Sequence, residues 1–122
     1  MVRSYPELNE RVRTRMNEYA IESPDIMKGF SELHTKAMAD GALSKKIKEL
    51  IALGIAICIH CDGCIAFHVY DALQAGASRD EITCTIGVAI LMGGGPSVVY
   101  GSQALDALKE FEHVGKEGWA GM

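Results

Sequence analysis

Helix-start signals recur along this chain at intervals that leave room for helices and for little else. Ser23 precedes Pro24, a pair typical of a helix N-cap followed by the first helical turn. Ser44 precedes an amphipathic segment, and the spacing of Ser78 and Glu81 matches a capping box. The longest apolar runs, residues 50–59 and 86–92, are far shorter than the roughly 20 residues that span a bilayer. The pattern predicts an all-α fold with no membrane-spanning helix.

The same signals divide the chain into about six helices. We expect them to begin near Pro6, Pro24, Lys45, Cys61, Arg79 and Ser97, and the run of glycines at 93–95 to be the clearest break. A chain of 122 residues that is 48% hydrophobic suits one compact core. We therefore expect a single domain over residues 1–122, with its core at about 24–112 and a loosely held tail at 115–122.

Charge and leader signals exclude several classes of partner. Sixteen acidic against twelve basic residues give a net charge of −4, and the two signs are interspersed. A nucleic-acid binder needs a basic patch, and a membrane-surface protein needs a polybasic segment, so neither is expected. The first twenty residues lack the apolar stretch of a secretory signal. We expect a cytoplasmic protein.

The cysteines are the chain's most reactive residues, and three of the four fall between positions 58 and 64. Cys61 and Cys64 are three residues apart, so at a helix start they share a face and their sulfurs can pair. A helix N-terminus lowers the pKa of a thiol, and the thiolate is the form that reduces peroxides and exchanges disulfides. The spacing predicts a redox-active pair.

Two further side chains can assist such a pair. His68 lies one helical turn after Cys64 and can stabilise a thiolate or carry its proton. Glu49 comes from the preceding helix and would face His68 if the two helices pack antiparallel. His60 could act as a second base or a metal ligand, or simply occupy an exposed or capping position. The helix start favours Cys61 as the attacking thiol, whereas the nearness of His68 favours Cys64.

Metal and phosphate sites are the alternatives. Cys58, Cys61, Cys64 and His68 parallel an iron–sulfur run, but Cys58 lies in an apolar helical segment where cysteine packs as a small hydrophobe. Zinc ligands would fall within nine residues, too close in sequence to surround an ion easily. The glycine-rich segment lacks the preceding strand of a phosphate loop. We therefore expect neither metal nor cofactor, and we expect Cys84 in the core.

Glu49, Cys61, Cys64 and His68 together match a family pattern, which continues through residues 75–82. Over roughly residues 30–112 the chain resembles the carboxymuconolactone decarboxylase and alkylhydroperoxidase D-like proteins. The resemblance implies an alkylhydroperoxidase D-like all-α bundle that assembles as a homo-oligomer, a trimer or a hexamer. It also implies a thiol-dependent peroxidase or disulfide reductase that acts on a small hydroperoxide or disulfide.

The resemblance further assigns roles to these residues. Cys64 attacks the peroxide, Cys61 resolves the resulting sulfenic acid, and His68 and Glu49 relay the proton. A dithiol protein or a lipoyl group then restores the thiols. One position departs from the pattern, because Gly63 stands where the better-characterised peroxidases of the family have histidine.

Two other functions stay open. The first is a redox sensor or interaction module that uses the same disulfide without turnover. The second is a decarboxylase-like enzyme that acts on a small lactone, although that branch generally lacks the cysteine pair.

Overall fold

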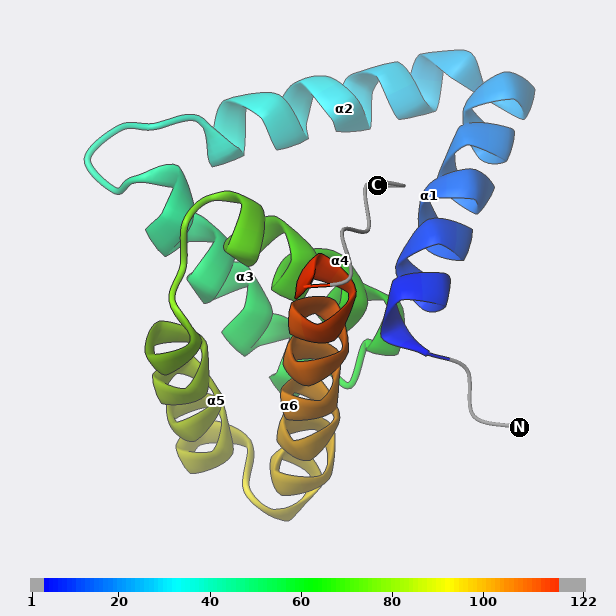
Figure 1. Cartoon of the computed structure of the whole chain (residues 1–122). Coiled ribbons are helices and arrows are strands. Elements are labelled where there is room, and N and C mark those ends of the chain that lie inside the picture. The colour runs from blue at the N-terminus through cyan, green and yellow to red at the C-terminus, as the bar shows by residue number, and fades with distance from the viewer. Residues whose placement is uncertain (1–3, 117–122) are drawn as a thin grey trace.

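The computed structural model describes residues 4–116, which form six helices and no strand (Figure 1). This confirms the predicted all-α fold. The helices are α1 (Tyr5–Glu22), α2 (Pro24–Met38), α3 (Lys45–Cys58), α4 (Asp62–Gln74), α5 (Arg79–Gly93) and α6 (Gly95–Lys116).

Two of the three predicted serine caps form their hydrogen bonds. Ser44 Oγ accepts a hydrogen bond from the Ile47 N–H at 3.2 Å. At the start of α5, Ser78 Oγ accepts from the Glu81 N–H at 3.0 Å, and Glu81 Oε1 accepts from the Ser78 N–H at 2.8 Å. The capping box is therefore confirmed. Ser23 occupies the N-cap position of α2, but its side chain makes no capping hydrogen bond.

We expect Ser78→Ala to lower the free energy of unfolding by about 1 kcal/mol, because the Glu81 N–H in the first turn loses its hydrogen-bond partner. Urea denaturation followed by circular dichroism measures the change. Ser102→Ala is the matched control, since the Ser102 hydroxyl only donates to the Val98 carbonyl on the exposed side of α6. An equal loss in both variants would contradict the importance of this cap.

The core lies where α3, α4, α5 and α6 meet. Its largest fully buried apolar side chains are Leu53, Ile57, Ile65, Ile82 and Leu108. α3 packs against α4 and α5, and α6 packs against α5 and α4. None of the helices in the described part of the chain combines the length and apolarity needed to cross a membrane.

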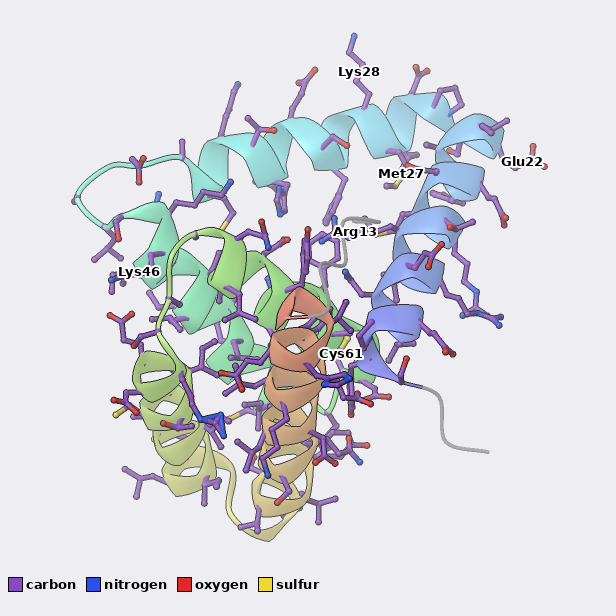
Figure 2. All side chains as sticks on the ribbon, in the orientation of Figure 1. Arg13, Glu22, Met27, Lys28, Lys46 and Cys61 are labelled. Carbon is purple, nitrogen blue, oxygen red and sulfur yellow. A yellow bond between two sulfur atoms is a disulfide. The ribbon has the colours of Figure 1, made fainter. Side chains whose placement is uncertain are left out.

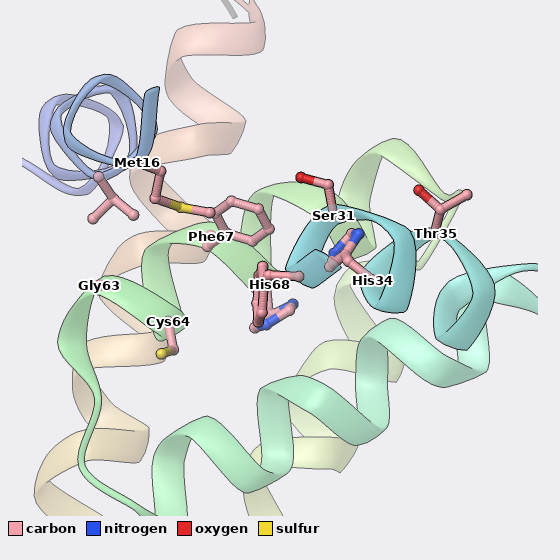
Figure 3. Close-up of a pocket in the computed structure, with 10 residues that line it drawn as sticks. Met16, Ser31, His34, Thr35, Gly63, Cys64, Phe67 and His68 are labelled. Atoms are coloured by element: carbon pink, nitrogen blue, oxygen red, sulfur yellow. The ribbon is translucent and has the colours of Figure 1, made fainter. Parts of the chain in front are cut away.

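α1 and α2 form an arm that extends over one side of this bundle (Figure 1). α1 contacts α4 and α6, whereas α2 has no buried residue. Arg13 reaches from α1 to α4, while Glu22 and Lys28 point away from the bundle (Figure 2). Between the arm and α4 lies a cavity of about 390 Å³ (Figure 3).

Three features differ from the expectations. The glycine run is mostly helical: α5 extends to Gly93, α6 begins at Gly95, and only Gly94, with φ 71°, separates them. Residues 115 and 116, expected in a loose tail, continue α6, and residues 117–122 lie outside the described residues. Cys84 is exposed rather than in the core, because it lies on the face of α5 opposite Ile82 and Ile86.

Candidate functional site

The turn between α3 and α4 places the cysteine pair. α3 ends in a Schellman motif: the His60 N–H donates to the Ile57 carbonyl at 3.3 Å, and the Cys61 N–H donates to the Ala56 carbonyl at 3.1 Å. His60 fills the position that usually holds glycine and has φ 60°. The motif reverses the chain direction within a few residues, so α4 begins close to the end of α3 and packs against it.

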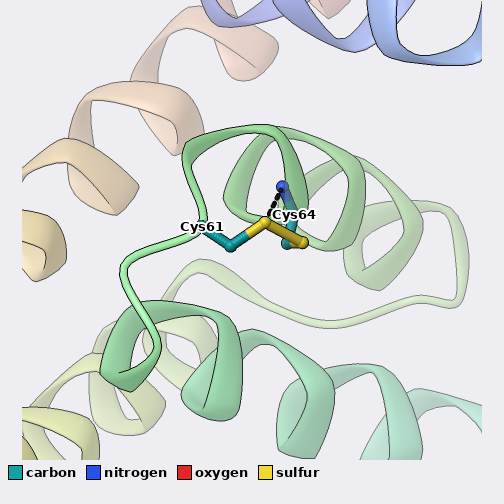
Figure 4. Close-up of a disulfide and its surroundings, with 2 residues drawn as sticks. All are labelled: Cys61 and Cys64. Carbon is teal, nitrogen blue, oxygen red and sulfur yellow. Dashed lines mark hydrogen bonds between the residues drawn. A yellow bond between two sulfur atoms is a disulfide. The ribbon is translucent and has the colours of Figure 1, made fainter. Parts of the chain in front are cut away.

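Cys61 is the N-cap residue of α4. Its Sγ atom accepts a hydrogen bond from the Cys64 N–H at 3.2 Å. The two sulfur atoms form a disulfide, with the Cα atoms 5.1 Å apart (Figure 4). The predicted pairing at a helix start is therefore present in the fold. A thiolate at this position would accept hydrogen bonds from the free N–H groups of the first turn. The positive end of the helix dipole would also stabilise its charge.

His68 lies one turn further along α4 and meets Glu49 of α3. The His68 Nδ1 and Glu49 Oε1 atoms are 2.8 Å apart, as the expected helix packing requires. The Glu49 side chain is 0% exposed, and that of His68 is 18% exposed. A buried carboxylate at this distance fixes the orientation of the imidazole ring. The catalytic roles of these residues stay predictions.

A second polar group lies behind this pair. Arg13 Nη2 contacts Asp71 Oδ1 at 2.9 Å, and the guanidinium stands 4.1 Å from the centroid of the Phe67 ring. Burial raises the pKa of Asp71 above its ordinary value, the Arg13 charge opposes this rise, and the Glu49 charge adds to it. Arg13 and Asp71 were not among the residues predicted for the site, although Asp71 follows His68 by three residues and so shares its helix face.

Cys64 and His68 both line the cavity under the arm. The other lining residues come from α1, α2 and α4 and are mostly apolar (Figure 3): Val12, Met16, Phe30, Ser31, His34, Thr35, Gly63 and Phe67. His34 was not among the residues predicted for the site. A small molecule with an apolar body can therefore approach the Cys64 sulfur beside the imidazole.

Gly63 has a structural reason in this fold. A Cβ atom added at position 63 would lie 3.0 Å from Val12 Cγ2, tighter than ordinary van der Waals contact. The packing of α1 against the start of α4 thus leaves little room for the histidine that the resemblance suggests at this position. A larger side chain there would require Val12 to move by a few tenths of an ångström.

The remaining sequence candidates lie apart from the cavity. The His60 ring stacks on Tyr100, with centroids 4.7 Å apart, and does not line the cavity. Cys58 donates to the Ala89 carbonyl at 3.4 Å and lies near Ser97, so it packs between α3 and α5. It lines the groove between α3 and α5, whereas Cys64 and His68 line the cavity under the arm.

The fold and this site together define a class of small all-α proteins, in which a cysteine pair caps a helix beside a buried glutamate–histidine contact. The sequence profile of the carboxymuconolactone decarboxylase family matches residues 24–107. The chain belongs to this family, with the matching region displaced by a few residues from the expected 30–112.

Known proteins of several bacteria are similar to the chain. An uncharacterized protein of Cupriavidus necator is 39% identical over 82 residues, which cover 67% of this chain and 73% of that protein. A family member from Legionella pneumophila, crystallised in its apo form, is 42% identical with a TM-score of 0.85, covering 88% of this chain and 96% of its own. A Thermotoga maritima family member with a suggested role in the antioxidative response is 28% identical with a TM-score of 0.83, covering 92% and 96%.

Proposed function

We propose that this chain is a thiol-dependent peroxidase or disulfide reductase that cycles the Cys61–Cys64 pair between dithiol and disulfide. The observation that carries the proposal is that Cys64 and His68 open onto one cavity while a fully buried Glu49 holds His68 at 2.8 Å. A nucleophile, a base and an orienting acid are the components of an activated thiol site. The antioxidative role suggested for the Thermotoga maritima relative agrees with this chemistry.

The residues of this site and an external dithiol account for every atom and electron in the reaction with a hydroperoxide. The Cys64 thiolate attacks the terminal peroxide oxygen, the O–O bond breaks, and the departing alkoxide takes a proton from His68 to leave as an alcohol. Cys61 then attacks the sulfur of the Cys64 sulfenic acid. The S–O bond breaks, water leaves, and the disulfide forms. A dithiol reductant, either a protein or a lipoyl group, supplies two electrons and two protons to restore both thiols.

A thiol count tests the proposal. The reduced protein is treated with one equivalent of tert-butyl hydroperoxide, and its free thiols are titrated before and after. We expect the loss of two thiols, their return on addition of dihydrolipoamide, and continued turnover when both reagents are in excess. Cys84→Ser is the matched control, because Cys84 is exposed on α5 and should not affect the loss.

Other outcomes distinguish the alternatives. Oxidation that is slow and stoichiometric, without turnover by any dithiol, would replace the enzyme with a redox sensor. Thiols that do not react with hydroperoxide but exchange with a small disulfide would leave the reductase half of the proposal. Thiols inert to both reagents would refute the proposal.

The proposed compartment is the cytoplasm, where cellular reductants keep such a pair active.

We further propose that the protein is a homo-oligomer, a trimer or a hexamer. A groove of about 470 Å³ runs between α3 and α5 and is almost entirely apolar. Its lining includes Ile47, Ile51, Ile55, Val88 and Met92, all of them exposed in the single chain. An apolar surface of this kind is typical of the contact between subunits of an obligate oligomer.

We expect Ile55→Asp to convert the oligomer into monomers, because the Ile55 side chain is 55% exposed in the single chain and an interface would bury the new charge without a partner. Sedimentation velocity measures the change in mass. Thr83→Asp serves as the control and should leave the mass unchanged, because Thr83 is an exposed residue of α5 that lies outside the groove. A wild-type protein that sediments as a monomer would refute the assembly.

A further inference from the structure

Three helices bring a third set of polar side chains together behind the cysteine pair. His34 of α2, Glu49 of α3 and Asp71 of α4 each offer an atom that can bind a metal ion, and these atoms all lie within 4.8 Å of one another. None of the three comes from the cysteine-containing turn. The cluster adjoins the cavity, which His34 lines (Figure 3).

Two atoms of this cluster are buried without a hydrogen-bond partner among the described residues. Glu49 is fully buried, and its Oε1 atom meets His68, but its Oε2 atom has no partner. The Nε2 atom of His34 is likewise buried and unpartnered. A buried polar atom left without a partner is unfavourable, so native structures satisfy nearly all of them with protein, water or ions.

The charges of the cluster are also unbalanced. Two carboxylates, Glu49 and Asp71, lie close enough for the charge of one to disfavour ionisation of the other. Arg13 pairs with Asp71 at 2.9 Å and provides one positive charge. Buried carboxylates are usually paired or coordinate a metal, and a divalent cation would supply the positive charge that Arg13 alone does not provide while accepting the lone pairs of Glu49 and His34.

We propose that His34, Glu49 and Asp71 form a binding site for one divalent transition-metal ion of the zinc and cobalt class. One imidazole nitrogen with two carboxylate oxygens is a ligand set that these ions take. Metal–ligand distances of about 2.0–2.2 Å bring tetrahedral ligands to roughly 3.3 Å from one another, so small side-chain rotations must draw the cluster together. The fourth position would open to the cavity. This site goes beyond the thiol chemistry and does not depend on it.

Cobalt(II) titration of the oxidised protein tests the site, because the Cys61–Cys64 disulfide then cannot provide thiolate ligands. The Cys84→Ser background removes the exposed free thiol. We expect one Co²⁺ per chain after desalting, and visible absorption typical of nitrogen and oxygen ligands without thiolate charge-transfer bands. Zn²⁺ should displace the cobalt and raise the melting temperature of the oxidised protein.

A matched pair of histidine variants assigns the ligand. His34→Gln should weaken Co²⁺ binding by about a hundredfold, whereas His113→Gln, which changes an exposed histidine of α6, should leave it unchanged. Circular dichroism checks that both variants fold. Less than stoichiometric binding by the wild-type protein, thiolate bands, or equal affinity in the two variants would overturn the proposal. Because no turnover is measured, these results are independent of the peroxidase assay.

Discussion

Cys61→Ser and Cys64→Ser should both abolish peroxide turnover, by on the order of a thousandfold or more, yet they should fail at different steps. Cys64 lines the cavity with His68, whereas Cys61 caps the start of α4 and its sulfur accepts the Cys64 N–H. Reduced Cys61→Ser should therefore still attack one equivalent of hydroperoxide and stop at a sulfenic acid on Cys64. Cys64→Ser should form no sulfenic acid in the same time.

Dimedone labelling followed by mass spectrometry of the tryptic peptides detects the sulfenic acid. Cys84→Ser should behave as the wild-type protein, since Cys84 lies on the exposed face of α5. Dimedone found on Cys61 in the Cys64→Ser variant would reverse the assignment, because the advantage of the helix start would then outweigh the nearness of His68. Full turnover in either variant would remove the disulfide from the mechanism.

Local signals made much of the fold predictable. The Ser44 cap and the Ser78–Glu81 box depend only on residues three apart, and both occur in the structure as the sequence suggests. The glycine run misled the prediction of helix bounds, because helix breaking depends on backbone angles rather than on glycine content. Within residues 93–95 only Gly94 takes a positive φ, and Gly93 stays helical, where an added Cβ would collide with Ser97.

The candidate site likewise contains some residues that sequence spacing predicts and others that it does not. Cys61, Cys64 and His68 share one helix face, so their proximity follows from spacing alone. The contact of Glu49 with His68 depends on the packing of α3 against α4, and the short turn between these helices made that packing predictable. Arg13 and His34 belong to the arm, and Arg13 meets Asp71 across 58 residues of sequence. No local pattern determines where the arm rests, so these two side chains became part of the site only in the folded chain.

Glu49 and His68 should act as one unit during turnover. Glu49→Gln keeps the shape of the side chain and an oxygen that can accept from His68, but removes the charge that stabilises a protonated imidazole. We expect turnover with tert-butyl hydroperoxide to fall by about a hundredfold, and His68→Asn to lower it by a similar factor. The double variant should be no slower than the slower single variant, because each substitution already disables the relay.

The control is Glu112→Gln, which replaces a carboxylate paired with Arg79 near the end of α6, far along the chain from the cavity lining. It should retain wild-type turnover, and thermal unfolding of all variants checks that the fold survives. Effects that multiply in the double variant would mean that Glu49 and His68 contribute separately, so the 2.8 Å contact would be structural. Non-additive loss, with the buried carboxylate acting only through the imidazole, is the result that a proton relay requires.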